Sequence, residues 1–172
     1  VQHNQVTAVA ASSTVGRFPL AAALEDNDAT WWISAMGSMP QGKGTEYMEF
    51  QLSPVVTRLS AVSIKIPPLP VGPLSVRTFR IAIPDDSVSS QMTPTTTWIN
   101  ATDELTVENK TGYQRFELSL GIDARSIRIV CTTNQISRFL VQNIEVAGDD
   151  NNNINLNNNQ FHAVGLYSIK FE

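Results

Sequence analysis

The stretch ALEDNDATWW, residues 23 to 32, decides how the rest of the sequence is interpreted. Its apolar start gives way to four consecutive residues with acid or amide side chains, and the stretch ends in two adjacent tryptophans. Asp and Asn side chains hydrogen-bond their own backbone in turns, whereas a buried tryptophan anchors the residues that pack around it. The stretch therefore predicts a tight turn leading into a core, with one tryptophan inside and the other free to face a ligand.

Outside this stretch, short segments alternate apolar and polar residues, as half-buried strands do. Turn residues separate them, residues 19–24 indicate a short helical piece, and residues 35–44 lack any periodicity and indicate a long loop. Many short strands with turns between them are typical of an all-β antiparallel β-sandwich. The segments predicted to form strands are residues 6–11, 47–52, 56–66, 75–83, 113–120, 126–131, 139–146 and 161–171.

The length of 172 residues fits one domain with a two-layer core. We expect residues 1–148 to form the sandwich. The Asn-rich tract 149–160 cannot bury enough apolar surface to offset its ordering entropy, so it predicts an irregular or disordered loop. Residues 161–172 alternate again and predict an additional strand at a sheet edge of the same domain.

Four motifs, in the same order along the chain, resemble the discoidin (coagulation factor 5/8 type C) and family-32 carbohydrate-binding modules of the galactose-binding-like superfamily. Residues 23–32 are similar to that family's Ala-Leu-Asp-Gly-Asp-x-x-Thr-x-Trp motif. Residues 10–13 resemble its opening Ala-Ser-Ser, residues 46–52 its Glu-Trp-Leu-Glu-Ile-Asp-Leu strand, and residues 141–148 its last strand. The resemblance implies a jelly-roll β-sandwich with Trp32 in the core.

The resemblance also implies a calcium site, because family members hold the ion with this acidic loop and a glutamate on the last strand. Calcium prefers six to eight oxygen ligands. Here the family's glutamate falls at Asn143, which removes one charge from the ligand set. The alternative is a solvated turn whose side chains cap neighbouring backbone. The candidate calcium ligands are Glu25, Asp26, Asn27, Asp28 and Thr30.

A ligand surface is expected on the loops at one end of the sandwich. Aromatic rings stack on apolar partners or sugar faces, and methionine adapts its shape to a partner. The alternative interpretation places the tryptophan in the core and lets the methionines cover the end of the barrel. The candidate ligand-binding residues are Trp31, Met36, Met39, Gln41, Lys43, Asn134, Gln135 and Arg138.

Composition excludes several classes of partner. The formal net charge of −4 and the pI near 5.1 argue against nucleic acid. No apolar run approaches the length of about 18 residues that spans a bilayer, and only Lys43 supplies the charge that lipid binding at these loops requires. The single cysteine, Cys131, cannot form an internal disulfide, which favours an intracellular compartment. Two glycosylation sequons, at Asn100 and Asn109, leave secretion open.

Catalysis has little support in the sequence. The two histidines, His3 and His162, leave no evident base for a nucleophile, and Cys131 lies in an alternating segment that predicts a buried thiol. We therefore predict a non-catalytic recognition module that binds a protein partner or a glycan. The alternative is a calcium-assisted carbohydrate-binding module attached to an enzyme or a cell-surface protein.

Overall fold

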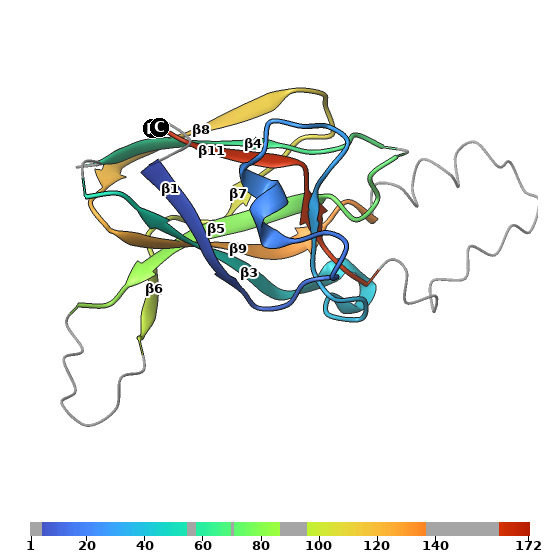
Figure 1. Ribbon diagram of the computed structural model, residues 1–172, viewed down its shortest axis with the longest axis horizontal. Helices are drawn as coiled ribbons and strands as arrows, with labels where there is room; N and C mark the ends of the chain where they lie inside the picture. The colour runs from blue at the N-terminus through green and yellow to red at the C-terminus, as the bar shows by residue number, and fades with distance from the viewer. Residues whose placement is uncertain (1–4, 55–57, 70, 87–95, 137–161) are drawn as a thin grey trace, which may run out of the picture.

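The computed structural model describes residues 5–54, 58–69, 71–86, 96–136 and 162–172. Two antiparallel sheets pack face to face (Figure 1), as the sequence predicted. In the larger sheet β7 (Leu105–Thr106) also pairs with β5. The main path of this sheet runs through β1 (Val6–Ala11), β3 (Lys43–Leu52), β9 (Ser126–Asn134), β5 (Val76–Pro84) and β6 (Trp98–Asn100).

The smaller sheet covers the other side of the core. Two short 3-10 helices, η2 (Leu20–Leu24) and η3 (Pro40–Gly42), lie in the connections. A two-stranded ladder pairs β10 (Gly165–Leu166) with β2 (Trp32–Ile33). The smaller sheet has the order β11 (Ser168–Phe171), β4 (Leu59–Lys65), β8 (Tyr113–Ile122).

The core lies between these sheets because alternate side chains of each strand point inward. Trp32 is fully buried, as predicted, and Phe50 of the larger sheet meets Phe171 of the smaller one with ring centroids 5.0 Å apart. Phe79 contacts Phe116 across the same layer, with centroids 5.0 Å apart. The indole and these rings therefore join the two sheets.

The predicted strands within the described residues are observed in the predicted order, with differences at their ends. The last one is divided into β10 and β11, and β2, β6 and β7 were not predicted. β1 has the predicted bounds, whereas β3 begins at Lys43 and takes up the end of the predicted loop 35–44. β9 runs to Asn134, beyond the predicted end at residue 131, because Thr133 pairs with β3 and β5 and Asn134 pairs with β5. The predicted strand 139–146 and the Asn-rich tract 149–160 lie outside the described residues.

The segment after the Asn-rich tract is part of the core. β11 pairs with β4 at the edge of the smaller sheet (Figure 1), and its Ile169 and Phe171 are buried. The edge position agrees with the prediction, but these side chains fill the space between the sheets. Within the described residues, β11 is thus the closing strand of the sandwich.

Ser12 and Ser13, in the first motif of the family resemblance, bind a buried carboxylate. Ser12 Oγ and Ser13 Oγ each donate a hydrogen bond of 2.5 Å to Oε2 of Glu46, which starts a motif strand of the larger sheet. Two donors compensate the cost of burying this acid. Behind it, Cys131 is fully buried, as predicted, and burial together with the charge of Glu46 raises the pKa of its thiol to about 12.

Replacing Trp32 with alanine should cost about 3–5 kcal/mol of unfolding free energy, because the indole is buried and its removal leaves a cavity. Urea denaturation followed by circular dichroism measures the change. The control is Val9→Ala, at a side chain 52% exposed on β1, which should cost less than about 0.5 kcal/mol. Equal unfolding midpoints for the two variants would contradict the central role of Trp32.

Candidate binding site

The acidic turn, residues 25–30, is held by lysines of the smaller sheet. Lys65 Nζ forms an ion pair with Asp28 Oδ1 and lies 3.5 Å from Asp26 Oδ1. Lys170 Nζ lies 2.8 Å from the second carboxylate oxygen of Asp26. Lysine ammonium groups therefore contact both aspartates among the candidate calcium ligands.

The strand register places these contacts. Lys65 pairs with Tyr113 on one side and with Ser168 on the other, so the three residues form one row across the smaller sheet. The Tyr113 hydroxyl donates to Asp26 Oδ1 at 2.9 Å and lies 3.0 Å from Ser168 Oγ. Lys170 Nζ sits 3.9 Å from the centre of the tyrosine ring, within cation–π range. This row and the neighbouring Lys170 thus bring two ammonium groups and one hydroxyl to the acidic turn.

The remaining turn oxygens bind within the turn. Thr30 Oγ1 donates to Glu25 Oε2 at 3.0 Å, and the backbone N–H of Ala29 donates to Asn27 Oδ1 at 2.9 Å. Among the residues that the structure describes, no three His, Cys, Asp or Glu side chains are grouped to hold a metal ion. The described part of the donor set does not fit calcium, because the Asp26 and Asp28 carboxylates are paired with lysine ammonium groups; Asn143, at the position of the family's glutamate, lies outside the described residues.

The Asp26 contacts predict an acid-sensitive part of the stability. Hydrogen bonds from Lys170 and Tyr113 lower the pKa of the Asp26 carboxyl from 3.8 to about 2. A carboxyl whose pKa is lower in the folded state stabilises the protein above its unfolded pKa, and this contribution is lost as the pH falls toward the folded value. The stability gap between the wild type and Asp26→Asn should therefore narrow between about pH 4 and pH 2.

Urea midpoints at pH 6, 4, 3 and 2 measure this gap. Asp123→Asn, at an exposed carboxyl outside the acidic turn, is the control for removing one negative charge. A gap between the wild type and Asp26→Asn that stays constant down to pH 2 would exclude the assigned role of this carboxylate.

Three of the predicted loop residues lie inside the protein. Met39 is fully buried. Asn134 is 1% exposed and donates from Nδ2 to the Ala163 carbonyl at 2.7 Å. Gln135 is fully buried and donates to the carbonyls of Val76 and Val107, at 3.2 Å each. The Asn134 and Gln135 amides donate to buried backbone carbonyls, and Met39 belongs to the core. The prediction that these three residues lie on a ligand surface is therefore corrected.

The other loop residues fall into three groups. Trp31 is half-buried between Phe18 and Tyr167, with ring centroids 5.8 Å and 6.1 Å away. Arg138 lies outside the described residues. Met36, Gln41 and Lys43 are exposed, and Gln41 adopts a left-handed backbone with φ of 54°. Of the predicted surface residues that the structure describes, one half-covered indole and three exposed side chains remain accessible.

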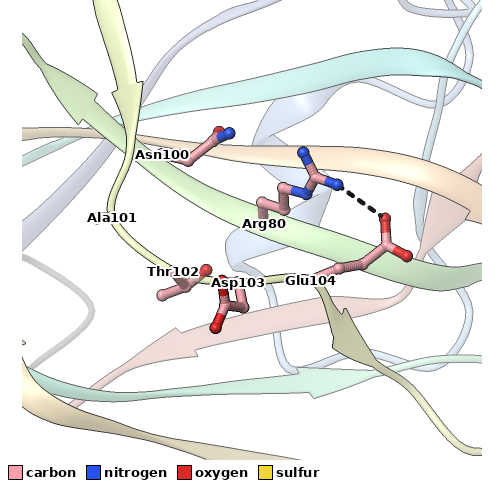
Figure 2. A pocket seen from close by; sticks show the side chains of 6 residues that line it. All are labelled: Arg80, Asn100, Ala101, Thr102, Asp103 and Glu104. Carbon is pink, nitrogen blue, oxygen red and sulfur yellow. Dashed lines mark ion pairs between the residues drawn. The ribbon is translucent and has the colours of Figure 1, made fainter.

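A polar groove of about 460 Å³ opens beside the β5–β6 ladder (Figure 2). Arg80 and Glu104 lie on one side of it, with Nη2 and Oε2 3.6 Å apart, and Asn100 points in from β6. The groove is lined by Arg80, Asn100, Ala101, Thr102, Asp103 and Glu104.

The groove walls are held by neighbouring strands. Glu104 accepts a hydrogen bond of 2.8 Å from Thr132 Oγ1, and Thr102 Oγ1 accepts one of 3.0 Å from the Ile81 backbone N–H. The Arg80–Glu104 separation exceeds the usual length of a charge-assisted hydrogen bond. The Arg80 guanidinium is therefore held near Glu104 without forming a close hydrogen bond to it.

The groove belongs to the outer face of the larger sheet. Strand register aligns Glu49, Arg128, Ala82 and Asn100 in one row across four strands. The Arg128 guanidinium carbon lies 4.0 Å from the Trp98 ring centre and 3.9 Å from that of Tyr47. A strip of aromatic and charged groups thus adjoins the groove.

The sequence reasoning did not identify this groove. In the sequence, Arg80 is one residue of the predicted strand 75–83, and Asn100 stands out only as part of a glycosylation sequon. The short strand Trp98–Asn100 carried no prediction of its own. The available signal was the alternation itself, since polar residues that interrupt apolar ones on a two-layer sheet must face outward.

Comparisons place the fold among known proteins. No family model and no curated protein matches the chain. Solved structures match it over nearly its full length and show that it has the β-sandwich fold of family-32 carbohydrate-binding modules and F5/8 type C domains. The NanJ family-32 module of Clostridium perfringens, in complex with galactose, has a TM-score of 0.63, 14% identity, and coverage of 98% of this chain and 94% of that one.

Two further structures give the same result. An F5/8 type C domain from Bacteroides fragilis has a TM-score of 0.64 and 15% identity, covering 99% of this chain and 93% of that one. The CpGH89 CBM32-5 module of Clostridium perfringens, in complex with GalNAc-β-1,3-galactose, has a TM-score of 0.62 and 7% identity, covering 98% and 96%. Within the described residues, no helix is long and apolar enough to cross a membrane.

Proposed function

We propose that the protein is a non-catalytic carbohydrate-binding module that holds a neutral saccharide in the polar groove on the outer face of the larger sheet. Two structures with the same fold are complexes with galactose or with GalNAc-β-1,3-galactose. The observation that carries the proposal is the convergence of Arg80, Asn100 and Glu104 on one groove.

The groove chemistry matches a sugar ring. A guanidinium only donates hydrogen bonds, a carboxylate only accepts them, and an amide does both. Neighbouring hydroxyls of a saccharide can donate to Glu104 while accepting from Arg80, across the 3.6 Å gap between these side chains. The volume of about 460 Å³ lies within the range of small-molecule sites.

The charge balance favours neutral sugars over acidic ones. The groove holds one guanidinium, on Arg80, and two carboxylates, on Asp103 and Glu104. A carboxylated sugar would bring a third negative charge near these two, and like charges at close range are unfavourable.

The non-catalytic part of the proposal is supported by Cys131. This thiol is fully buried, and its pKa of about 12 keeps it protonated at neutral pH. A thiol must ionise to act as a nucleophile. The one cysteine of the chain is therefore unsuited to covalent catalysis.

A protein partner at the loop end is the second candidate function. Met36, on the predicted loop 35–44, is 48% exposed. Val71, in the connection after β4, is 71% exposed. A protein partner at this end would remove such apolar side chains from water, which is favourable. Trp31, Gln41 and Lys43 would line such a contact, and they remain the proposed residues for a ligand at this end.

Replacing Arg80 with Met and Glu104 with Gln should each weaken binding of galactose, N-acetylgalactosamine or lactose about tenfold or more, because each removes a charge-assisted hydrogen bond. Isothermal titration measures the affinities after a neutral-glycan array has chosen the strongest probe. The matched control is Arg115→Met, at an exposed arginine paired with Glu117 and Glu172 on the smaller sheet.

The outcomes separate the possible sites. Loss of binding only in Trp31→Ala would keep the glycan function but move it to the loop end. An array without any signal would reject the glycan proposal.

A photo-crosslinking residue at position 36 tests the second candidate. A protein partner at the loop end should give a discrete adduct on gels, whereas the same residue at position 9, equally exposed on β1, should give none. Adducts of equal intensity at the two positions would argue against a specific contact.

A further inference from the structure

The contacts of the acidic turn lead beyond ligand binding. This turn resembles a calcium loop, yet its two best oxygen donors, on Asp26 and Asp28, contact lysine ammonium groups. We propose that Lys65 and Lys170 take the place of a metal ion, so that the sandwich reaches full stability without calcium.

The positions of the lysines support this replacement. Lys65 ends β4, its side chain is 18% exposed, and its Nζ reaches carboxylates on both Asp26 and Asp28. Lys170 approaches Asp26 from β11. Two fixed positive charges thus enter the turn from two adjacent strands, and their combined charge equals that of one Ca²⁺.

The neighbouring side chains complete the replacement. Beside the turn, the closing strand carries Ser168, whose hydroxyl lies 3.0 Å from the Tyr113 hydroxyl. Tyr113 donates to Asp26, whereas a metal ion would need an acceptor at that place. The ion pairs keep both ammonium groups charged, since Asp28 raises the pKa of Lys65 and Asp26 raises that of Lys170.

The replacement has a physical consequence for assembly. A calcium ion would join the turn to the sheet only when it is bound, whereas the lysines are covalent parts of β4 and β11. Asp26 and Lys170 are 144 positions apart, so this contact forms only when the closing strand is in place. The turn is thus held by the sheet itself.

The first experiment is thermal melting of the whole protein with 5 mM calcium chloride or with a chelator, at equal ionic strength. A ligand that binds only the folded state raises the midpoint. We expect equal midpoints in the two buffers, and magnesium serves as the control for a non-specific divalent effect. A midpoint raised by calcium and not by magnesium would overturn the proposal.

The second experiment tests whether the lysines hold the turn. The variant K65M/K170M should melt several degrees below the wild type, whereas Lys43→Met, at an exposed lysine of β3, should shift the midpoint by less than about 1 °C. Equal midpoints for the two variants would overturn the proposal.

If K65M/K170M does not fold, a double-mutant cycle gives the answer. K170M, D26N and their combination are then compared by urea midpoints. The combination should cost less than the sum of the single changes, because both remove the same contact. Strict additivity would show that Lys170 does not act through Asp26. No arm needs a sugar, so a failure here is independent of the proposed function.

Discussion

Burial of aromatic side chains between two sheets is the constraint on which the structure depends. Trp32, Phe50 and Phe79 are fully buried. Because side chains alternate along a strand, each inward ring fixes its neighbours on the outer face. Arg80 points outward because Phe79 and Ile81 point inward. The groove is therefore a consequence of the core: a register change on β5 would remove both at once.

The two faces of the molecule use charge in different ways. On the smaller sheet, Lys65 and Lys170 neutralise the acidic turn and leave little capacity for a ligand. On the larger sheet, Arg128 is bound to Glu49 and lies against Trp98, whereas the Arg80 guanidinium is 3.6 Å from Glu104. A site needs donors that are held in place and still available. By that criterion the groove is better suited to recognition than the turn.

The sequence was sufficient for the features that rest on local pattern. The bounds of β1 and the buried Cys131 follow from alternation and residue type, and the buried Trp32 was implied by the family resemblance. The resemblance in residues 23–32 placed the turn correctly before its tryptophans. Those properties are decided within a few residues, so a single chain without homologues reveals them.

The sequence could not reveal contacts between residues that lie far apart along the chain. Nothing near Asp26 shows that Lys170 will reach it from 144 positions away. Asn134 and Gln135 resemble surface amides, but the carbonyls of Ala163 and Val76 require them inside. Buried carbonyls must find donors, and which donors serve is settled only when the strands have assembled.

The buried thiol of Cys131 has an implication for laboratory handling of this protein. Oxidants and alkylating reagents attack the thiolate, and the closed sandwich gives them neither the ionised group nor access to it. Sulfur modification therefore has to wait for separation of the two layers. The rate at which this sulfur is labelled would follow how often the layers part, which makes the cysteine an intrinsic gauge of breathing motions.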